Sequence, residues 1–178
     1  DRGPGRGDRP VGATFGTDQC YAAFRDGSGF FQHGHTYMGH PVACAAALAV
    51  QTAIEDEGLL ANVRAMGAEL SDALHERFGN HRHIGDIRGR GLFMGLEIVA
   101  DRTDKSTFDP ALGLHARVKK EAMARGLMCY PMGGTIDGKH GDHVLLAPPF
   151  IVKSRDILDI VDRLGSAIDA AIASTNPQ

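Results

Sequence analysis

Cysteine is scarce in this sequence, and its placement favours neither a disulfide framework nor a metal site. Cys20, Cys44 and Cys129 are odd in number, widely separated and without a Cys-x-x-Cys pair. Such a set argues against a disulfide-stabilised fold and against a zinc knuckle. We therefore expect reduced thiols, and nothing near Cys129 in the sequence predicts the electropositive surroundings that a nucleophilic thiolate needs.

Long apolar runs and an excess of basic charge are also absent. No uninterrupted apolar run approaches the ~18 residues that suggest a membrane-spanning helix. The first ten residues, DRGPGRGDRP, have none of the apolar character of a signal peptide. The formal net charge is −3 with both signs mixed along the chain, so no basic stripe is available for nucleic acid. These absences predict a cytoplasmic protein without nucleic-acid or membrane partners.

The overall composition is that of a globular protein. Hydrophobic residues make up 43% and charged residues 23% of the 178 residues, close to the average of folded domains. A chain of this length can bury roughly two-thirds of its unfolded surface. We therefore expect a packed core rather than disorder or a fibrous repeat.

Local patterns predict a mixture of helices and strands. Pro41 and the alanine-rich run after it begin a long amphipathic helix that reaches about residue 76, with Gly58 as a possible kink or break. Further elements are expected as follows: a loose tail at 1–10, some strand character at 10–16, a short helix at 17–27, two strands within 83–99, a helix at 109–126, strands at 127–132 and 144–150, and a closing helix at 154–173.

The order of these elements lacks the regular strand-helix alternation of a doubly wound sheet. We predict an α/β fold class in the broad sense. The part after the long helix, residues 77–178, is expected to be α+β.

The stretch FFQHGHTYMGHPVACAAALAV, residues 30–50, crowds polar groups at the start of the long helix. His33, His35, His40 and Cys44 include soft metal ligands, but no acidic residue accompanies them and their spacing is not typical of zinc. Gly34 and Gly39, the Thr36 hydroxyl and the positive end of the helix dipole would suit an anion such as phosphate. A tight corner with no ligand explains the glycines equally well.

Two other groups of polar residues favour structural roles. Arg88 and Arg90 flank a glycine turn, where pairing with carboxylates is favoured over substrate contact. The loop MGGTIDGKHGDH contains Asp137, His140 and His143, but its glycines favour a loop held by its own hydrogen bonds over a metal site.

The segment GHTYMGHPVACAAALA closely resembles a segment of the class III aminotransferases, which are pyridoxal phosphate enzymes of fold type I. The resemblance continues through IRGRGLFMGLEIV, KKEAMARGLMCYPMGG and GDHVLLAPPF in the order and spacing of the carboxy-terminal part of that family. In the family, the threonine of this motif and a neighbouring main-chain amide hold the cofactor phosphate across a dimer interface. The resemblance therefore assigns cofactor binding to Thr36 and to the main-chain N–H of His35.

The same resemblance leaves the catalytic position without its lysine. The family pattern Lys-Gly-x-x-x-Gly-x-x-Pro-x-Gly-Ala corresponds to RGPGRGDRPVGA here, which places Arg2 where the family has lysine. A guanidinium is always protonated and weakly nucleophilic, so it cannot replace the lysine amine that bonds to the cofactor aldehyde.

The resemblance implies a transaminase that moves an amino group from an amine or amino acid to a keto acid, working as a homodimer with pyridoxal 5′-phosphate. This chain would be a carboxy-terminal fragment of such an enzyme and inactive alone. In that fragment, the resemblance implies that residues 1–40 end the cofactor-binding large domain, that residues 41–76 form the long connecting helix, and that residues 77–178 form the small α+β domain. The alternative is a non-catalytic phosphate-binding or dimerisation domain derived from that family.

Overall fold

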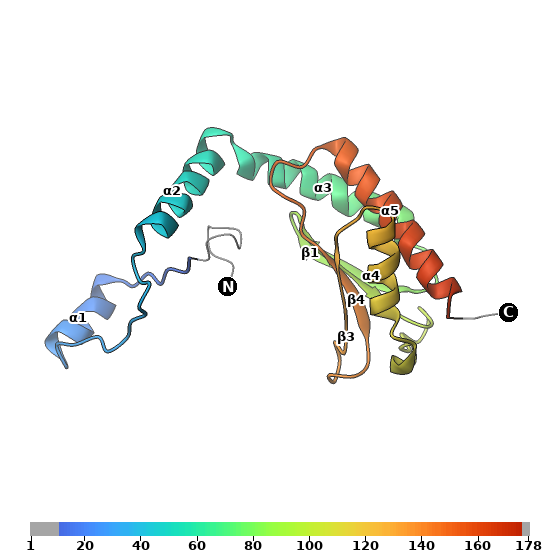
Figure 1. The fold of residues 1–178 in the computed structure, drawn as a ribbon, viewed down its shortest axis with the longest axis horizontal. Helices are drawn as coiled ribbons and strands as arrows, with labels where there is room; N and C mark the ends of the chain where they lie inside the picture. The colour runs from blue at the N-terminus through green and yellow to red at the C-terminus, as the bar shows by residue number, and fades with distance from the viewer. Residues whose placement is uncertain (1–10, 176–178) are drawn as a thin grey trace. The chain divides into compact units, whose positions relative to one another are not determined.

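The computed structural model describes residues 11–175, so the position of Arg2 and the expected tail at 1–10 lie outside the described residues. The chain divides into two compact units between Gly58 and Leu59, and each is described by itself. Figure 1 shows the elements in chain order. No helix in the described part is long and apolar enough to cross a membrane.

The first unit contains two helices, α1 (Asp18–Asp26) and α2 (Pro41–Asp56). Thr17 caps α1, because its side chain accepts a hydrogen bond from the Cys20 N–H. Pro41 begins α2, where its missing N–H costs no helical hydrogen bond. The strand character expected at 10–16 is not found at residues 11–16, because no neighbouring strand pairs with this extended segment.

The helix that begins at Pro41 is broken at Gly58. Gly58 has a φ of 60°, and α3 (Leu59–Phe78) begins directly after it as a separate helix. Positive φ is readily adopted by glycine, so the break forms without backbone strain. The structure places α3 with the second unit.

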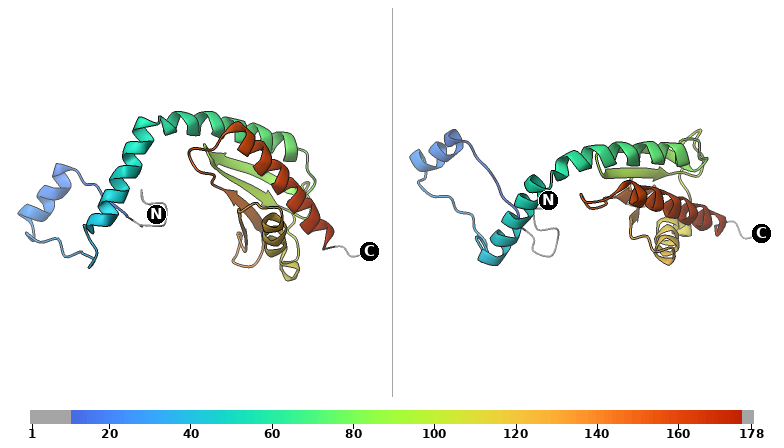
Figure 2. Two further views of the ribbon diagram at one scale, coloured as in Figure 1. Left: turned by 45° about the horizontal axis from the view of Figure 1, so that its top comes forward. Right: turned by 90° about the horizontal axis from the view of Figure 1, so that it is seen from above.

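The second unit is a four-stranded antiparallel sheet with three main helices on one face (Figures 1 and 2). The strand order is β1-β2-β4-β3, so β4 lies between β2 and β3. The elements are β1 (Ile84–Arg90), β2 (Phe93–Ile98), the short 3-10 helix η1 (Pro110–Leu112), α4 (Leu114–Ala124), β3 (Tyr130–Gly133), β4 (Asp142–Leu146) and α5 (Ser154–Ala173).

The core lies between the sheet and helices α3, α4 and α5. Alternate strand residues point into it, including Leu96 and Val144, which are fully buried. Leu74 on α3, Val118 on α4 and Leu164 on α5 meet them from the helices. The buried residues of α5 recur at helical spacing along one face.

The last two strands differ from the sequence-based expectation at their ends. β3 begins at Tyr130, three residues later than expected, and contains Pro131. Because β3 is an edge strand, Pro131 needs no ladder partner on its outer side. β4 begins already at Asp142, where it pairs with both Ile98 and Gly133.

An ion pair joins the ends of α3 and α5 and predicts acid sensitivity. The Asp169 carboxylate accepts hydrogen bonds from Arg77 at 2.6 Å and from the His81 ring at 3.0 Å. Partial burial acts to raise the pKa of Asp169, but the bonds from His81 and Arg77 outweigh it and the pKa is lowered. A carboxylate with a lowered folded-state pKa stabilises the fold above its ordinary pKa, and this contribution is lost as pH falls through the lowered value.

An ordinary aspartate becomes protonated near pH 4. On acidification below about this pH, we therefore expect the free energy of unfolding to fall less in Asp169→Asn than in the unchanged chain. Urea unfolding of the 178-residue chain between pH 7 and pH 2 measures this. Asp162→Asn is the control, because Asp162 is exposed on the same helix and has no ion pair in the described part of the chain. Equal acid dependence of the two variants would contradict the role given to Asp169.

Candidate functional site

The crowded segment between α1 and α2 forms a turn whose backbone is held by its own hydrogen bonds. The Met38 N–H donates to the His35 carbonyl at 3.0 Å, and the His40 N–H donates to the Tyr37 carbonyl at 3.1 Å. Gly39 has a φ of 69°, a conformation that few other residues adopt. Helix α2 then starts at Pro41. The sequence thus predicted both the corner and the helix that follows it.

The two predicted cofactor-binding groups lie on this turn with their donors available. Thr36 and His35 are both exposed. Within residues 11–175, the Thr36 hydroxyl and the His35 N–H have no hydrogen-bond partner. These are the donor types that a phosphate oxygen accepts from.

The charge around the turn favours an anion. Residues 28–44 contain no aspartate or glutamate, and the first turn of α2 carries no acidic residue. No side chain caps the start of α2, so its positive dipole end is not neutralised there. The residues present therefore fit a phosphate group.

Aromatic rings of the turn contact one another edge to face. The rings of His33 and His35 lie edge to face with centroids 5.1 Å apart, and His40 lies 6.1 Å from the Tyr37 ring. Among residues 11–175, no group of three or more histidine, cysteine or acidic side chains is placed to hold a metal ion. Phosphate binding by Thr36 and His35 stays a prediction.

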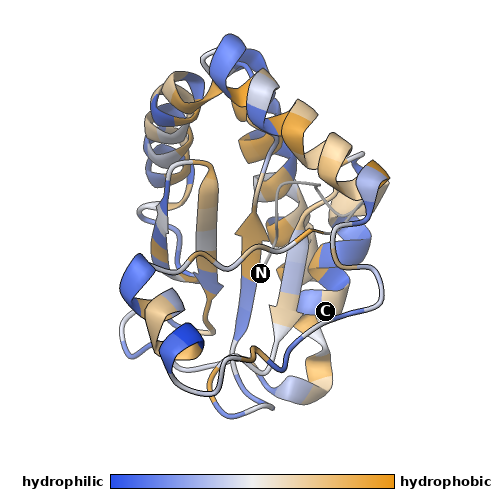
Figure 3. Cartoon of the chain, turned by 90° about the vertical axis from the view of Figure 1, so that its left-hand side faces the viewer, coloured by the Kyte–Doolittle hydropathy of each residue, from blue (hydrophilic) through white to orange (hydrophobic). Residues whose placement is uncertain are grey.

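The turn belongs to a unit that has no buried residue in either of its helices. Phe15 is 92% exposed and Tyr37 is 79% exposed. Most of α2 falls on the hydrophobic side of the scale in Figure 3. A helix that is apolar on all sides is typical of a buried position. The first unit therefore exposes apolar side chains on α2 and on the turn.

Arg88 and the loop residues Asp137 and His140, which were singled out in the sequence, form structural pairs. Arg88 donates to Asp86 at 2.7 Å, and this hydrogen bond lowers the pKa of the Asp86 carboxyl. His140 bonds to Asp137 at 2.7 Å in the β3–β4 loop, where backbone N–H bonds from His140 and Lys139 hold the pKa of Asp137 well below its usual range. Arg90 is exposed on the last residue of β1.

The sequence analysis did not predict the contact between Asp142 and His115. Asp142 is buried and accepts hydrogen bonds from the N–H and the ring of His115 at the start of α4, at 3.2 and 2.9 Å. The contact joins residues far apart in sequence, and no local spacing could have revealed it.

The sequence is similar to known aminotransferases along most of its length. Residues 3–168 match the family described as aminotransferase class-III. An uncharacterized aminotransferase of Schizosaccharomyces pombe is 46% identical over 147 residues, which are 83% of this chain and 31% of that protein. An aminotransferase of Gibberella zeae is 41% identical over 172 residues, which are 96% of this chain and 34% of that protein.

Solved structures show the same fold. An amine transaminase from an uncultivated Pseudomonas species matches with a TM-score of 0.82 at 32% identity, over 95% of this chain and 37% of that chain. A transaminase from the marine bacterium Virgibacillus matches with a TM-score of 0.81 at 26% identity, over 90% and 35% of the two chains. The chain spans about a third of the length of the curated relatives that it matches.

Proposed function

Because the chain belongs to the class III aminotransferases, a pyridoxal phosphate-dependent family of fold type I, we propose that it is the part of a transaminase that binds the cofactor phosphate. The observation that carries this proposal is the exposed turn with the free donors of Thr36 and His35. The bound cofactor supplies the electron sink for amino-group transfer. The whole enzyme would transfer an amino group from an amine or amino acid to a keto acid.

The phosphate would be held from two directions. The Thr36 hydroxyl and the His35 N–H each donate one hydrogen bond, and the start of α2 adds its dipole. The apolar surface of the first unit supports a homodimer in which this turn reaches the cofactor of the partner subunit. The second unit would be the small carboxy-terminal domain.

The 178-residue chain should not transaminate by itself. Arg2 stands in the sequence where the family has its lysine, and a guanidinium does not form the required bond to the cofactor. The chain would then be a phosphate-binding or dimerisation module when alone. Incubation with pyridoxal 5′-phosphate, an amine and a keto acid tests this, and amino transfer by the purified chain would overturn it.

A chimaera tests the role of the turn. Residues 11–175 of this chain would replace the matching part of the Gibberella zeae aminotransferase, so that all preceding residues come from that relative. We expect the chimaera to form dimers and to retain pyridoxal 5′-phosphate through dialysis, as measured by light scattering and by cofactor absorbance. A stable dimer that retains no cofactor would contradict the proposal.

In this chimaera we expect Thr36→Val to weaken cofactor binding by about 10- to 100-fold, since a hydrogen bond to a charged group contributes about 1.5–3 kcal/mol. Thr36→Ser should retain most of the affinity because it keeps the hydroxyl. Thr52→Val, on the exposed surface of α2, is the matched control. Equal dissociation constants for Thr36→Val and the control would remove Thr36 from the site.

A further inference from the structure

Two histidines, His81 and His83, lie in the short connection between α3 and β1. The Nδ1 atom of His81 lies 3.1 Å from the main-chain nitrogen of His83, and its Nε2 atom lies 3.0 Å from a carboxylate oxygen of Asp169 on α5. A backbone N–H can only donate a hydrogen bond, and an ionised carboxylate can only accept one. The neutral His81 ring therefore carries its proton on Nε2 and uses Nδ1 as an acceptor.

The ring of His83 has the opposite tautomer. Its Nδ1 atom lies 2.9 Å from the carbonyl oxygen of Ala100 and 3.2 Å from that of Val99. Carbonyl oxygens only accept, so this Nδ1 atom carries the proton. A second proton would enter the His83 ring at Nε2 and would leave both contacts intact.

A second proton on His81 would instead break one of its hydrogen bonds. It would enter at Nδ1, where it would face the hydrogen of the His83 N–H. Both groups would then be donors, so the attraction between them would be replaced by repulsion. The contact with Asp169 would remain and would become an ion pair, which is stronger than a hydrogen bond from a neutral ring.

The surroundings of His81 supply a fixed negative charge. Although partial burial acts to raise the pKa of Asp169, the hydrogen bonds from His81 and Arg77 lower it, so this carboxylate stays ionised at neutral and mildly acidic pH. The His81 side chain is 16% exposed, and its hydrogen-bond partners belong to the second unit. The charged and titratable groups near the ring are Arg77 from α3, Asp169 from α5, Arg82 and His83 from the connection, and Asp101 and Arg102 from the segment after β2.

We propose that His81 is a pH-responsive latch that holds the start of β1 to the end of α5. While its ring is neutral, His81 joins the His83 N–H to the Asp169 carboxylate. When the ring is protonated, the His83 N–H is released and the ring stays with Asp169. Histidine is the side chain that ordinarily changes charge between about pH 5 and pH 8, so mild acid would open the latch. The proposal goes beyond the proposed function, because it involves neither the cofactor nor amino-group transfer.

The test is NMR spectroscopy of the 178-residue chain, labelled with ¹⁵N and ¹³C and titrated from about pH 8 to about pH 5. At the start, the ring ¹⁵N signals should show the Nε2–H tautomer for His81 and the Nδ1–H tautomer for His83. As the His81 ring is protonated, the protection of the His83 amide against hydrogen exchange should fall about tenfold, after correction for the intrinsic rate at each pH. The Val99 amide, which donates to the His83 carbonyl at 2.9 Å, should keep its protection.

Three results would overturn the latch. The first is an Nδ1–H tautomer for neutral His81. The second is a His81 ring that stays neutral down to about pH 5. The third is a His83 amide whose protection does not follow the protonation of His81.

Two substitutions at position 81 separate the latch from a merely structural histidine. His81→Asn places an amide oxygen near the former Nδ1 atom, and this acceptor does not titrate. The His83 amide should then stay protected over the whole pH range. His81→Gln places its amide nitrogen near the former Nε2 atom, which keeps a donor for Asp169 but no acceptor for His83. In this variant the protection of the His83 amide should be about tenfold lower at every pH.

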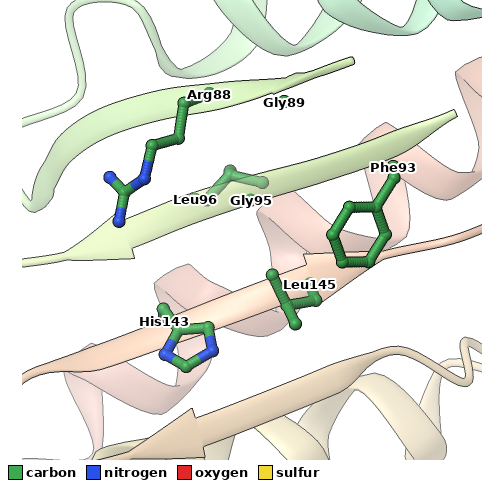
Figure 4. Close-up of a pocket in the computed structure, with 7 residues that line it drawn as sticks. All are labelled: Arg88, Gly89, Phe93, Gly95, Leu96, His143 and Leu145. Carbon is green, nitrogen blue, oxygen red and sulfur yellow. The ribbon is translucent and has the colours of Figure 1, made fainter. Parts of the chain in front are cut away.

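The matched control is His143→Asn. His143 is another partly buried histidine, on β4 (Figure 4), and its Nδ1 atom lies 2.6 Å from the Thr135 hydroxyl. This variant should leave the pH dependence at His83 unchanged. Thermal unfolding at about pH 7.5 checks that each variant is folded. A folded His81→Asn variant that loses His83 protection in acid as the unchanged chain does would refute the latch.

Discussion

Replacing Gly67 by alanine is expected to lower the free energy of unfolding of the second unit by about 1–3 kcal/mol, toward the upper end of that range. Gly67 lies on α3 where the helix crosses the β1–β2 turn. An alanine Cβ at position 67 would lie 2.6 Å from the Cα and 2.7 Å from the carbonyl carbon of Gly91. Both obstacles are backbone atoms, so they cannot move aside as a flexible side chain does. Helix α3 would have to shift away from the sheet.

The matched control is Gly165→Ala on α5. Its Cβ would also meet an obstacle, at 2.5 Å, but this is the Nε atom of the flexible Arg77 side chain. The higher helix propensity of alanine, about 1 kcal/mol, should offset most of the cost of moving Arg77. Urea unfolding followed by circular dichroism measures both variants. A loss of stability at Gly165 equal to that at Gly67 would contradict the argument from backbone contact.

The contact of Gly67 with Gly91 marks the limit of what the sequence predicted. Apolar spacing and helix-ending glycines predicted the main helices, including the stop at Gly126, which has a φ of 73°. Periodicity reports only which face of an element is buried. It does not report which residue of α3 touches which turn of the sheet, and the glycine at position 67 gives no local signal of that contact.

The same limit applies to the strands. The glycine turn predicted the β1–β2 hairpin, but β4 began two residues earlier than expected because its first residue, Asp142, pairs with strands on both sides. Strand ends depend on neighbours that are distant in sequence. The placement of β4 between β2 and β3 likewise could not be derived from local patterns.

The candidate site was easier to predict from the sequence because its residues are close together along the chain. Thr36, His35 and the start of α2 lie within one short segment, so the motif alone placed them together. The sequence left a metal, a phosphate and a bare corner open, and the structure adds that the Thr36 hydroxyl and the His35 N–H have no hydrogen-bond partner within residues 11–175.

Replacing Asp142 by leucine is expected to destabilise the second unit by about 2–4 kcal/mol, since it removes a buried charged acceptor and leaves its partners unsatisfied. Asp142 is only 7% exposed, and its carboxylate links β4 to α4 through the N–H and the ring of His115. Gly133 closes over this contact, because a Cβ there would lie 2.5 Å from the His115 ring. A larger apolar side chain has no room to replace the carboxylate without displacing α4.

Two further variants separate the contributions of this contact. Asp142→Asn keeps an oxygen acceptor for the His115 N–H but removes the charge, and we expect it to cost about half as much as the leucine variant. His115→Ala removes the ring and keeps the backbone N–H bond, so it should cost about 1 kcal/mol. A double-mutant cycle with Asp142→Asn and His115→Ala, measured by urea unfolding, gives the coupling between the two side chains. A coupling near zero would show that Asp142 acts through the start of α4 alone and not through the His115 ring.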